Sequence, residues 1–131
     1  MAEAKANPIR DKSFAFALSV VPLYKHLQSA REYVISKQLL RSGTSVGANI
    51  EEATAAASRR DFLYRMTIAS KEAREALFWL KLSHHSDFIQ ELDVSSEITA
   101  AEELVRMLTA IVKTTSRRMD QEEAGPNPNF H

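Results

Sequence analysis

The sequence predicts an all-α protein, an antiparallel, left-handed, up-and-down four-helix bundle. Apolar residues recur every three or four positions along four separate segments, the spacing of one face of an α-helix. Only three glycines and four prolines occur in 131 residues, too few for the many turns of a sheet protein. No segment alternates apolar and polar residues as a half-buried strand does. Short connections between the four segments favour antiparallel neighbours packed at about 20°.

The first helix is expected over residues 13–31. Its apolar residues step by four, three and four positions: Phe16, Val20, Leu23 and Leu27. Pro22 lies inside this segment and lacks a backbone donor, which predicts either a kink or a late start of the helix. Residues 1–12 are expected to be a flexible N-terminal segment that precedes the bundle domain, residues 13–119.

The second helix is expected over residues 35–57. Its apolar stripe is made largely of small residues: Leu39, Gly43, Val46, Ile50, Ala53 and Ala57. A glycine inside a helix costs about 1 kcal/mol relative to alanine. We therefore expect Gly43 and Gly47 to be present because a neighbouring helix approaches closely there.

The third helix is expected over residues 59–83, with Ser58 as its N-cap. Its stripe again steps by four and three positions: Phe62, Met66, Ala69, Ala73, Ala76 and Leu80. A surface connection is expected over residues 83–94, because serines and charged residues are frequent there.

The fourth helix is expected over residues 96–119. Its stripe of Ile98, Ala101, Val105, Leu108, Val112 and Thr115 is broadened by Leu104, Met107 and Ile111. A stripe of this width indicates contact with two neighbours. Residues 120–131 are expected to form a disordered tail, because they contain Gly125, Pro126 and Pro128.

Composition excludes several classes of site. The chain has no cysteine, so it has neither disulfides nor thiolate metal ligands, and a cytoplasmic location is expected. No apolar run is long enough to span a bilayer, so no membrane partner is expected. His84 and His85 are adjacent, which on a helix directs them about 100° apart and disfavours joint metal binding. We expect no metal, no cofactor and no small-molecule substrate.

One short motif raises the question of catalysis. Residues 43–47 read G-T-S-V-G and fit the G-x-S-x-G elbow that presents a nucleophilic serine, here Ser45. That elbow requires a strand before the serine and a helix after it, whereas these residues lie inside a helical stripe. Close packing of helices is the favoured interpretation, and a small serine hydrolase is kept as an unfavoured alternative.

The net charge is zero, but the two parts of the chain differ. Residues 1–74 carry twelve Lys/Arg and seven Asp/Glu, a net charge of +5, whereas residues 75–131 carry five and ten, a net charge of −5. This division suits complementary faces of neighbouring subunits, or one basic surface. An antiparallel pair of the third and fourth helices would bring one set of residues to the same end of the bundle: Arg59, Arg60, Arg65, Lys113, Arg117 and Arg118. This basic end is a candidate for nucleic-acid contact.

Polar residues beside the apolar stripes of the second and third helices form a second candidate site. Because charges flanked by aromatic and aliphatic residues need partners, we predict an ion-pair and hydrogen-bond network between helices or subunits. Its members are Arg41, Ser42, Ser45, Asn49, Glu52, Lys71, Glu72, Glu75 and Trp79.

The run YVISKQLLRSGTSVGANIEEA over residues 33–53 resembles the signature of the bacterial four-helix bundle family associated with 23S rRNA intervening sequences. Its second block is matched by Asp61-Phe62, Lys71-Glu72-Ala73, Glu75 and Trp79-Leu80, and the resemblance covers residues 14–118. The resemblance implies a bundle subunit that forms a homopentameric ring. A distant relative, the accessory variability determinant of diversity-generating retroelements, binds nucleic acid through a strongly basic surface, from which this neutral chain departs.

Together these observations predict a non-enzymatic helical-bundle protein that assembles with copies of itself and serves as a scaffold or adaptor. The pentamer comes from the resemblance alone. A nucleic-acid-binding accessory protein that uses the basic end is the main alternative.

Overall fold

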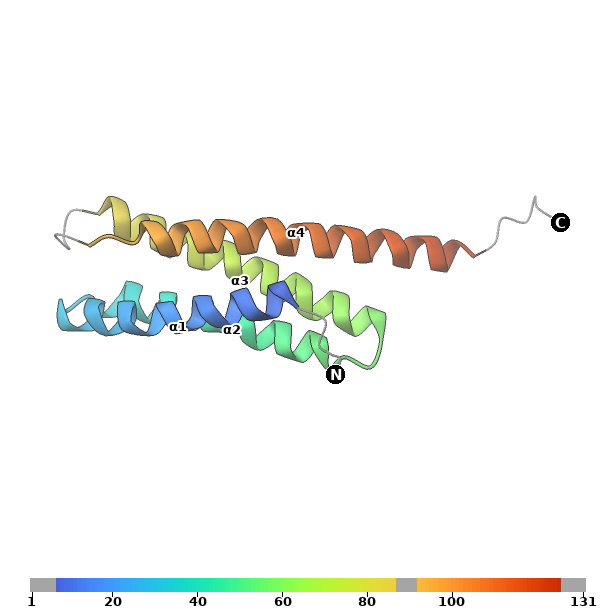
Figure 1. Ribbon diagram of the computed structural model, residues 1–131, viewed down its shortest axis with the longest axis horizontal. Helices are drawn as coiled ribbons and strands as arrows, with labels where there is room; N and C mark the ends of the chain where they lie inside the picture. The colour runs from blue at the N-terminus through green and yellow to red at the C-terminus, as the bar shows by residue number, and fades with distance from the viewer. Residues whose placement is uncertain (1–6, 87–91, 126–131) are drawn as a thin grey trace.

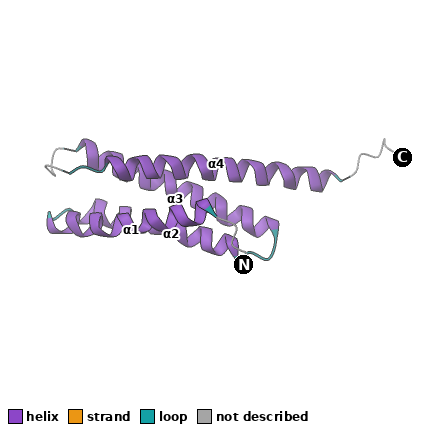
Figure 2. Ribbon diagram, viewed as in Figure 1, coloured by secondary structure: helices purple, strands orange, loops and turns teal. Residues whose placement is uncertain are grey.

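The computed structural model describes residues 7–86 and 92–125 and contains four helices (Figure 1). They are α1 (Pro8–Ser29), α2 (Tyr33–Thr54), α3 (Arg59–His85) and α4 (Ser95–Ala124). Within these residues there is no strand, as Figure 2 shows, and the predicted all-α class is confirmed.

Consecutive helices pack side by side and run in alternate directions. Contacts between α1 and α2, α2 and α3, and α3 and α4 are extensive, and those between α1 and α4 are fewer. In the part of the chain that the structure describes, the backbones of the diagonal pairs α1–α3 and α2–α4 do not approach each other closely. The C-terminal end of α4 extends past the turn that joins α2 to α3 (Figure 1).

The core is formed where the predicted apolar stripes meet. The stripes of the first three helices are buried from Phe16 in α1 to Leu80 in α3, apart from the half-buried Phe62 and the exposed Ala57 beyond the end of α2. In α4 only Ala101, Leu104 and Leu108 are fully buried. The remaining apolar residues of that broad stripe are half-buried, because α4 has one extensive neighbour, α3, and a weaker contact with α1.

The first helix starts earlier than the sequence analysis predicted. Asn7 caps it by accepting a hydrogen bond from the Arg10 amide at 3.3 Å, and Pro8 occupies the first turn, where its missing donor is harmless. Residues 8–12 are therefore helical, and a start delayed to Pro22 is wrong. Pro22 is exposed to solvent, where water can satisfy the carbonyl that it leaves without a partner.

The bounds of the other three helices also differ from those predicted. The second helix starts and ends two or three residues early, at Tyr33 and Thr54, and the third continues to His85. The fourth helix continues to Ala124 and ends at Gly125, whose φ of 64° suits glycine. Residues 120–124 are thus helical, whereas the rest of the predicted tail, 126–131, lies outside the described residues, as does 87–91 of the predicted connection.

The two central glycines of α2 lie against α1. A Cβ atom on Gly43 would lie 3.0 Å from one methyl group of Val20 and 3.2 Å from the other. A Cβ atom on Gly47 would lie 3.5 Å from the Ser13 carbonyl oxygen, an ordinary contact distance. The predicted close approach is confirmed, and it is tighter at Gly43.

Candidate functional site

Arg41 on α2 joins two carboxylates of α3. Its Nη1 lies 2.9 Å from Glu72 Oε2, and its Nη2 donates to Glu75. Trp79 Nε1 donates to the same Glu75 carboxylate at 3.0 Å. Half of the Arg41 side chain is open to water, whereas Glu72 is only 14% exposed. We call these four residues the Arg41 cluster.

Contacts within the Arg41 cluster favour the ionised forms of Glu75 and Arg41. The hydrogen bond from Trp79 lowers the pKa of Glu75, and Arg41 lowers it further, although partial burial acts in the opposite direction. The hydrogen bond to Glu75 in turn raises the pKa of Arg41. Both groups are ionised at neutral pH, so the cluster is a charged link between α2 and α3.

The structure divides the predicted polar network into parts. A second group forms around Asn49, whose Nδ2 donates to the Ser45 carbonyl at 2.9 Å and whose Oδ1 accepts from Arg65 at 3.4 Å. Ser42 is buried and donates to a carbonyl of its own helix. Within the described residues, Glu52 and Lys71 form no hydrogen bond or ion pair with either group.

The predicted basic end is partly neutralised. Arg59 pairs with Glu122, and Arg60 Nη2 lies 3.5 Å from Glu123. Both glutamates lie in the last turn of α4, in a segment that the sequence analysis assigned to a disordered tail. Arg65 is directed to Asn49 and over the ring of Tyr64 instead.

Of the other three cations of the predicted end, two lie where α3 meets α4 and one lies near the turn that joins α2 to α3. Lys113 and Arg117 line a groove between α3 and α4, whereas Arg118 lines, together with Arg59, a hollow beside Phe62. The structure therefore places Arg59 beside Arg118 and Lys113 beside Arg117, in two separate hollows.

The residues considered for catalysis or metal binding are separated from potential partners. Ser45 lies in the middle of α2, half-buried, and its hydroxyl accepts from Asn49 at 3.1 Å, which is not the geometry of a strand-to-helix elbow. The rings of His84 and His85 are exposed and nearly perpendicular at the end of α3. Residues 7–86 and 92–125 contain no group of three His, Asp or Glu side chains placed to bind a metal.

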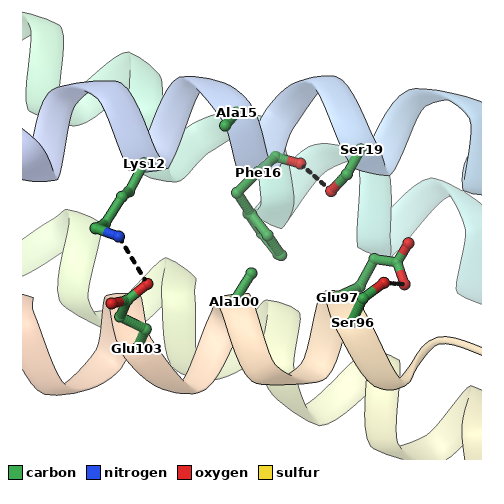
Figure 3. A pocket seen from close by; sticks show the side chains of 8 residues that line it. All are labelled: Lys12, Ala15, Phe16, Ser19, Ser96, Glu97, Ala100 and Glu103. Carbon is green, nitrogen blue, oxygen red and sulfur yellow. Dashed lines mark hydrogen bonds and ion pairs between the residues drawn. The ribbon is translucent and has the colours of Figure 1, made fainter.

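A pocket of about 310 Å³ lies between α1 and α4. Figure 3 shows the Phe16 side chain pointing from α1 toward Ala100, with the Lys12–Glu103 ion pair of 3.1 Å at one end. At the other end Ser96 bonds to Glu97 at 2.9 Å (Figure 3). Because Lys12 is already paired with Glu103 and the floor of the pocket is apolar, the pocket is a gap in the weaker α1–α4 packing.

Two exposed apolar stripes were missed by the sequence analysis. On α1, Phe14, Leu18 and Val21 are 65%, 59% and 37% exposed, and we call them the α1 stripe. On α3, Tyr64, Phe78 and Leu82 are 59%, 56% and 40% exposed, and we call them the α3 stripe. The α1 stripe repeats at helical spacing outside the core stripe, so a search for a second periodic face would have found it. On α3 only Phe78 and Leu82 are one turn apart, and Tyr64 lies fourteen residues earlier on the same face, with Lys71 between.

A cleft of about 260 Å³ lies between α1 and α2, directly beside Phe14. Arg10 bridges its edge to Glu51 through two bonds of 2.6 and 2.9 Å. None of the described helices has an apolar run that would let it cross a membrane.

Comparison with known proteins identifies relatives of this chain. Residues 5–110 match the family described as 23S rRNA-intervening sequence protein. A crystal structure of a protein with unknown function, from the S23 ribosomal protein family of Bacteroides thetaiotaomicron, superimposes with a TM-score of 0.75 at 44% sequence identity. The match covers 80% of this chain and 98% of that protein. No curated protein matches the chain.

Proposed function

This chain belongs to the 23S rRNA-intervening sequence protein family, and from that premise we propose that it is a non-enzymatic bundle that assembles with copies of itself and serves as a scaffold or adaptor. The observation that carries the proposal is the pair of exposed apolar stripes, one on α1 and one on α3. Large apolar side chains grouped on the surface of a small domain mark sites where another protein docks.

The α1 stripe has the features of an interface centre. Phe14 and Leu18 lie one turn apart and leave more than half of each side chain in water. Covering the exposed part of one such side chain contributes on the order of 1–2 kcal/mol. The cleft beside Phe14 offers a recess for a side chain of the docking copy.

The positions of the two stripes favour a ring. They lie on α1 and α3, which are diagonal helices and therefore face different sides of the bundle. Two unlike apolar faces on one subunit suit a head-to-tail contact, in which the first face of one copy covers the second face of the next. Repetition of such a contact gives a ring when the rotation between copies closes, as in the pentamer implied by the family resemblance.

The proposal is tested by placing charges in the α1 stripe. We expect Phe14→Asp/Leu18→Asp to reduce the particle from several times the 14.7 kDa chain mass to a single chain, because a buried unpaired carboxylate is strongly unfavourable. Light scattering coupled to gel filtration measures that mass. Circular dichroism should show unchanged helix content.

A matched control is Ala110→Asp/Thr114→Asp, which introduces two charges at the same spacing on an exposed part of α4. This variant should keep the wild-type mass. A wild-type protein that stays a single chain at about 100 μM, or an α1 variant that keeps its mass, would refute the proposal.

A further inference from the structure

A groove of about 410 Å³ runs between α3 and α4, and its walls carry only positive and neutral side chains. The positive ones are Lys71 and Arg74 from α3, and Lys113 and Arg117 from α4. Four hydroxyl side chains and one valine complete the walls, and no carboxylate lines them. On a chain whose net charge is zero, this is a marked local concentration of positive charge.

The four cations lack anionic partners. In the described part of the chain none of them forms an ion pair, whereas Arg10, Lys12, Arg41, Arg59 and Arg60 all do. Arg74 donates to the Thr109 hydroxyl at 3.1 Å, a neutral partner that leaves its charge uncompensated. Like charges held close together repel each other, so an anion between them would be bound favourably.

Ser70 gives independent evidence for a ligand. It lines the groove and is only 6% exposed, and its hydroxyl forms no hydrogen bond within the described residues. The other four buried serines all form one: Ser13, Ser36, Ser42 and Ser83. A buried hydroxyl without a partner is unfavourable and marks the place of an unseen acceptor or donor.

The chemistry of the walls selects the ligand. Lysine, arginine and hydroxyl groups donate hydrogen bonds to phosphate oxygens, and arginine binds them bidentately. The groove has no aromatic side chain on which a base could stack and no carboxylate to bind a sugar hydroxyl. Thr109 and Arg117 are eight residues apart on α4, about 12 Å along the helix axis, which is room for more than one phosphate.

We propose that the groove between α3 and α4 binds an anion that carries two or more adjacent phosphate groups, with Ser70 donating to one phosphate oxygen. A single-stranded nucleic-acid backbone and an inorganic polyphosphate share this chemistry. The site lies along the α3–α4 face, and its lining contains no residue of the α1 stripe or the α3 stripe.

The test compares two doubly neutralised variants of the full chain. Lys71→Gln/Arg117→Gln removes two groove charges, and Lys25→Gln/Lys37→Gln removes two charges from exposed positions on α1 and α2. Fluorescence anisotropy of a labelled single-stranded RNA of about twenty nucleotides, at about 50 mM salt, reports binding under permissive conditions. The groove variant should bind about tenfold more weakly, with a salt slope smaller by about 1.4, while the control stays within about twofold of wild type.

Competition with unlabelled tripolyphosphate distinguishes the two candidate ligands, a nucleic-acid backbone and an inorganic polyphosphate. Displacement of the RNA assigns the groove to a short phosphate chain, and failure to displace it assigns the groove to a polymer backbone. Ser70→Ala should weaken RNA binding about twofold or more without lowering the melting temperature, because its hydroxyl has no protein partner to lose. Equal losses in the groove and control variants, or no binding of either probe by wild type at about 100 μM, would overturn the proposal.

Discussion

Gly43 and Gly47 lie one turn apart on α2, yet they differ in the space around them. Adding a methyl group at either position gains about 1 kcal/mol of helix propensity. At Gly47 the added carbon meets only ordinary contacts, so Gly47→Ala should raise the free energy of unfolding by about 0.5–1 kcal/mol. At Gly43 the added carbon meets both Val20 methyls, so Gly43→Ala should lower the free energy of unfolding by about 1 kcal/mol. Urea unfolding followed by circular dichroism measures both values.

Removing the opposing methyls provides the control for this pair. In a Val20→Ala background the added carbon at position 43 no longer meets a side chain at close range, so Gly43→Ala should become stabilising. Equal effects of the two alanine substitutions in wild type would show that Val20 yields without cost.

The ends of the helices could be predicted only where the sequence has a clear capping signal beside the periodic apolar residues. Ser58 was read correctly as a cap because an acid follows at Asp61, and its hydroxyl does accept from that amide at 3.1 Å. Asn7-Pro8 is an equally good start signal but precedes the periodic residues, so α1 was predicted to begin five residues late. At the end of α4, polar residues give no periodicity, and only contact with α3 through Arg59 and Arg60 reveals that the helix continues.

Side-chain partners were less predictable than helices. The polar stripe predicts one network that includes Arg41, Glu72, Glu75 and Trp79, and these four are joined by hydrogen bonds between α2 and α3 and within α3. The rotamers and the exact helix rotation decide the rest, and they directed Lys71 to the α4 side of its helix. Sequence periodicity does not contain that information.

The Arg41 cluster, which links α2 to α3, should make the free energy of unfolding depend measurably on pH. Its lowered pKa means that Glu75 stabilises the folded state fully above the ordinary glutamate value of about 4.3, and less as the pH falls through its folded value. Glu75→Gln should therefore lower the free energy of unfolding by about 0.5–1 kcal/mol at pH 7, a modest value because the side chain is 35% exposed. Near pH 3.5 the difference from wild type should shrink.

Urea unfolding followed by circular dichroism at matched protein concentration checks this dependence, because assembly alters apparent stability. Glu52→Gln is the matched control, since Glu52 is exposed on α2 and has no ion-pair partner among the described residues. It should differ from wild type by less than about 0.3 kcal/mol at both pH values. A Glu75→Gln effect that is independent of pH would assign the loss to packing around Trp79 instead.

At the scale of the whole molecule, the bundle was predictable because four core stripes leave few ways to bury them. The second apolar faces were not recognised, because a search for one core treats further apolar residues on the same helix as scattered surface residues. Only the packed structure shows that the α1 and α3 stripes stay in water and face different sides.

Those two sides allow a decisive test of a head-to-tail assembly. One variant, Phe14→Asp/Leu18→Asp, lacks a usable α1 stripe, and a second, Phe78→Asp/Leu82→Asp, lacks a usable α3 stripe. If the α1 stripe of one copy covers the α3 stripe of the next, each variant alone stays a single chain, because every contact needs both stripes. A mixture of the two retains one intact pair of stripes, so light scattering should find a dimer of unlike chains and nothing larger. Should either variant alone form dimers, like stripes pair with like across a two-fold axis, and the ring geometry is excluded.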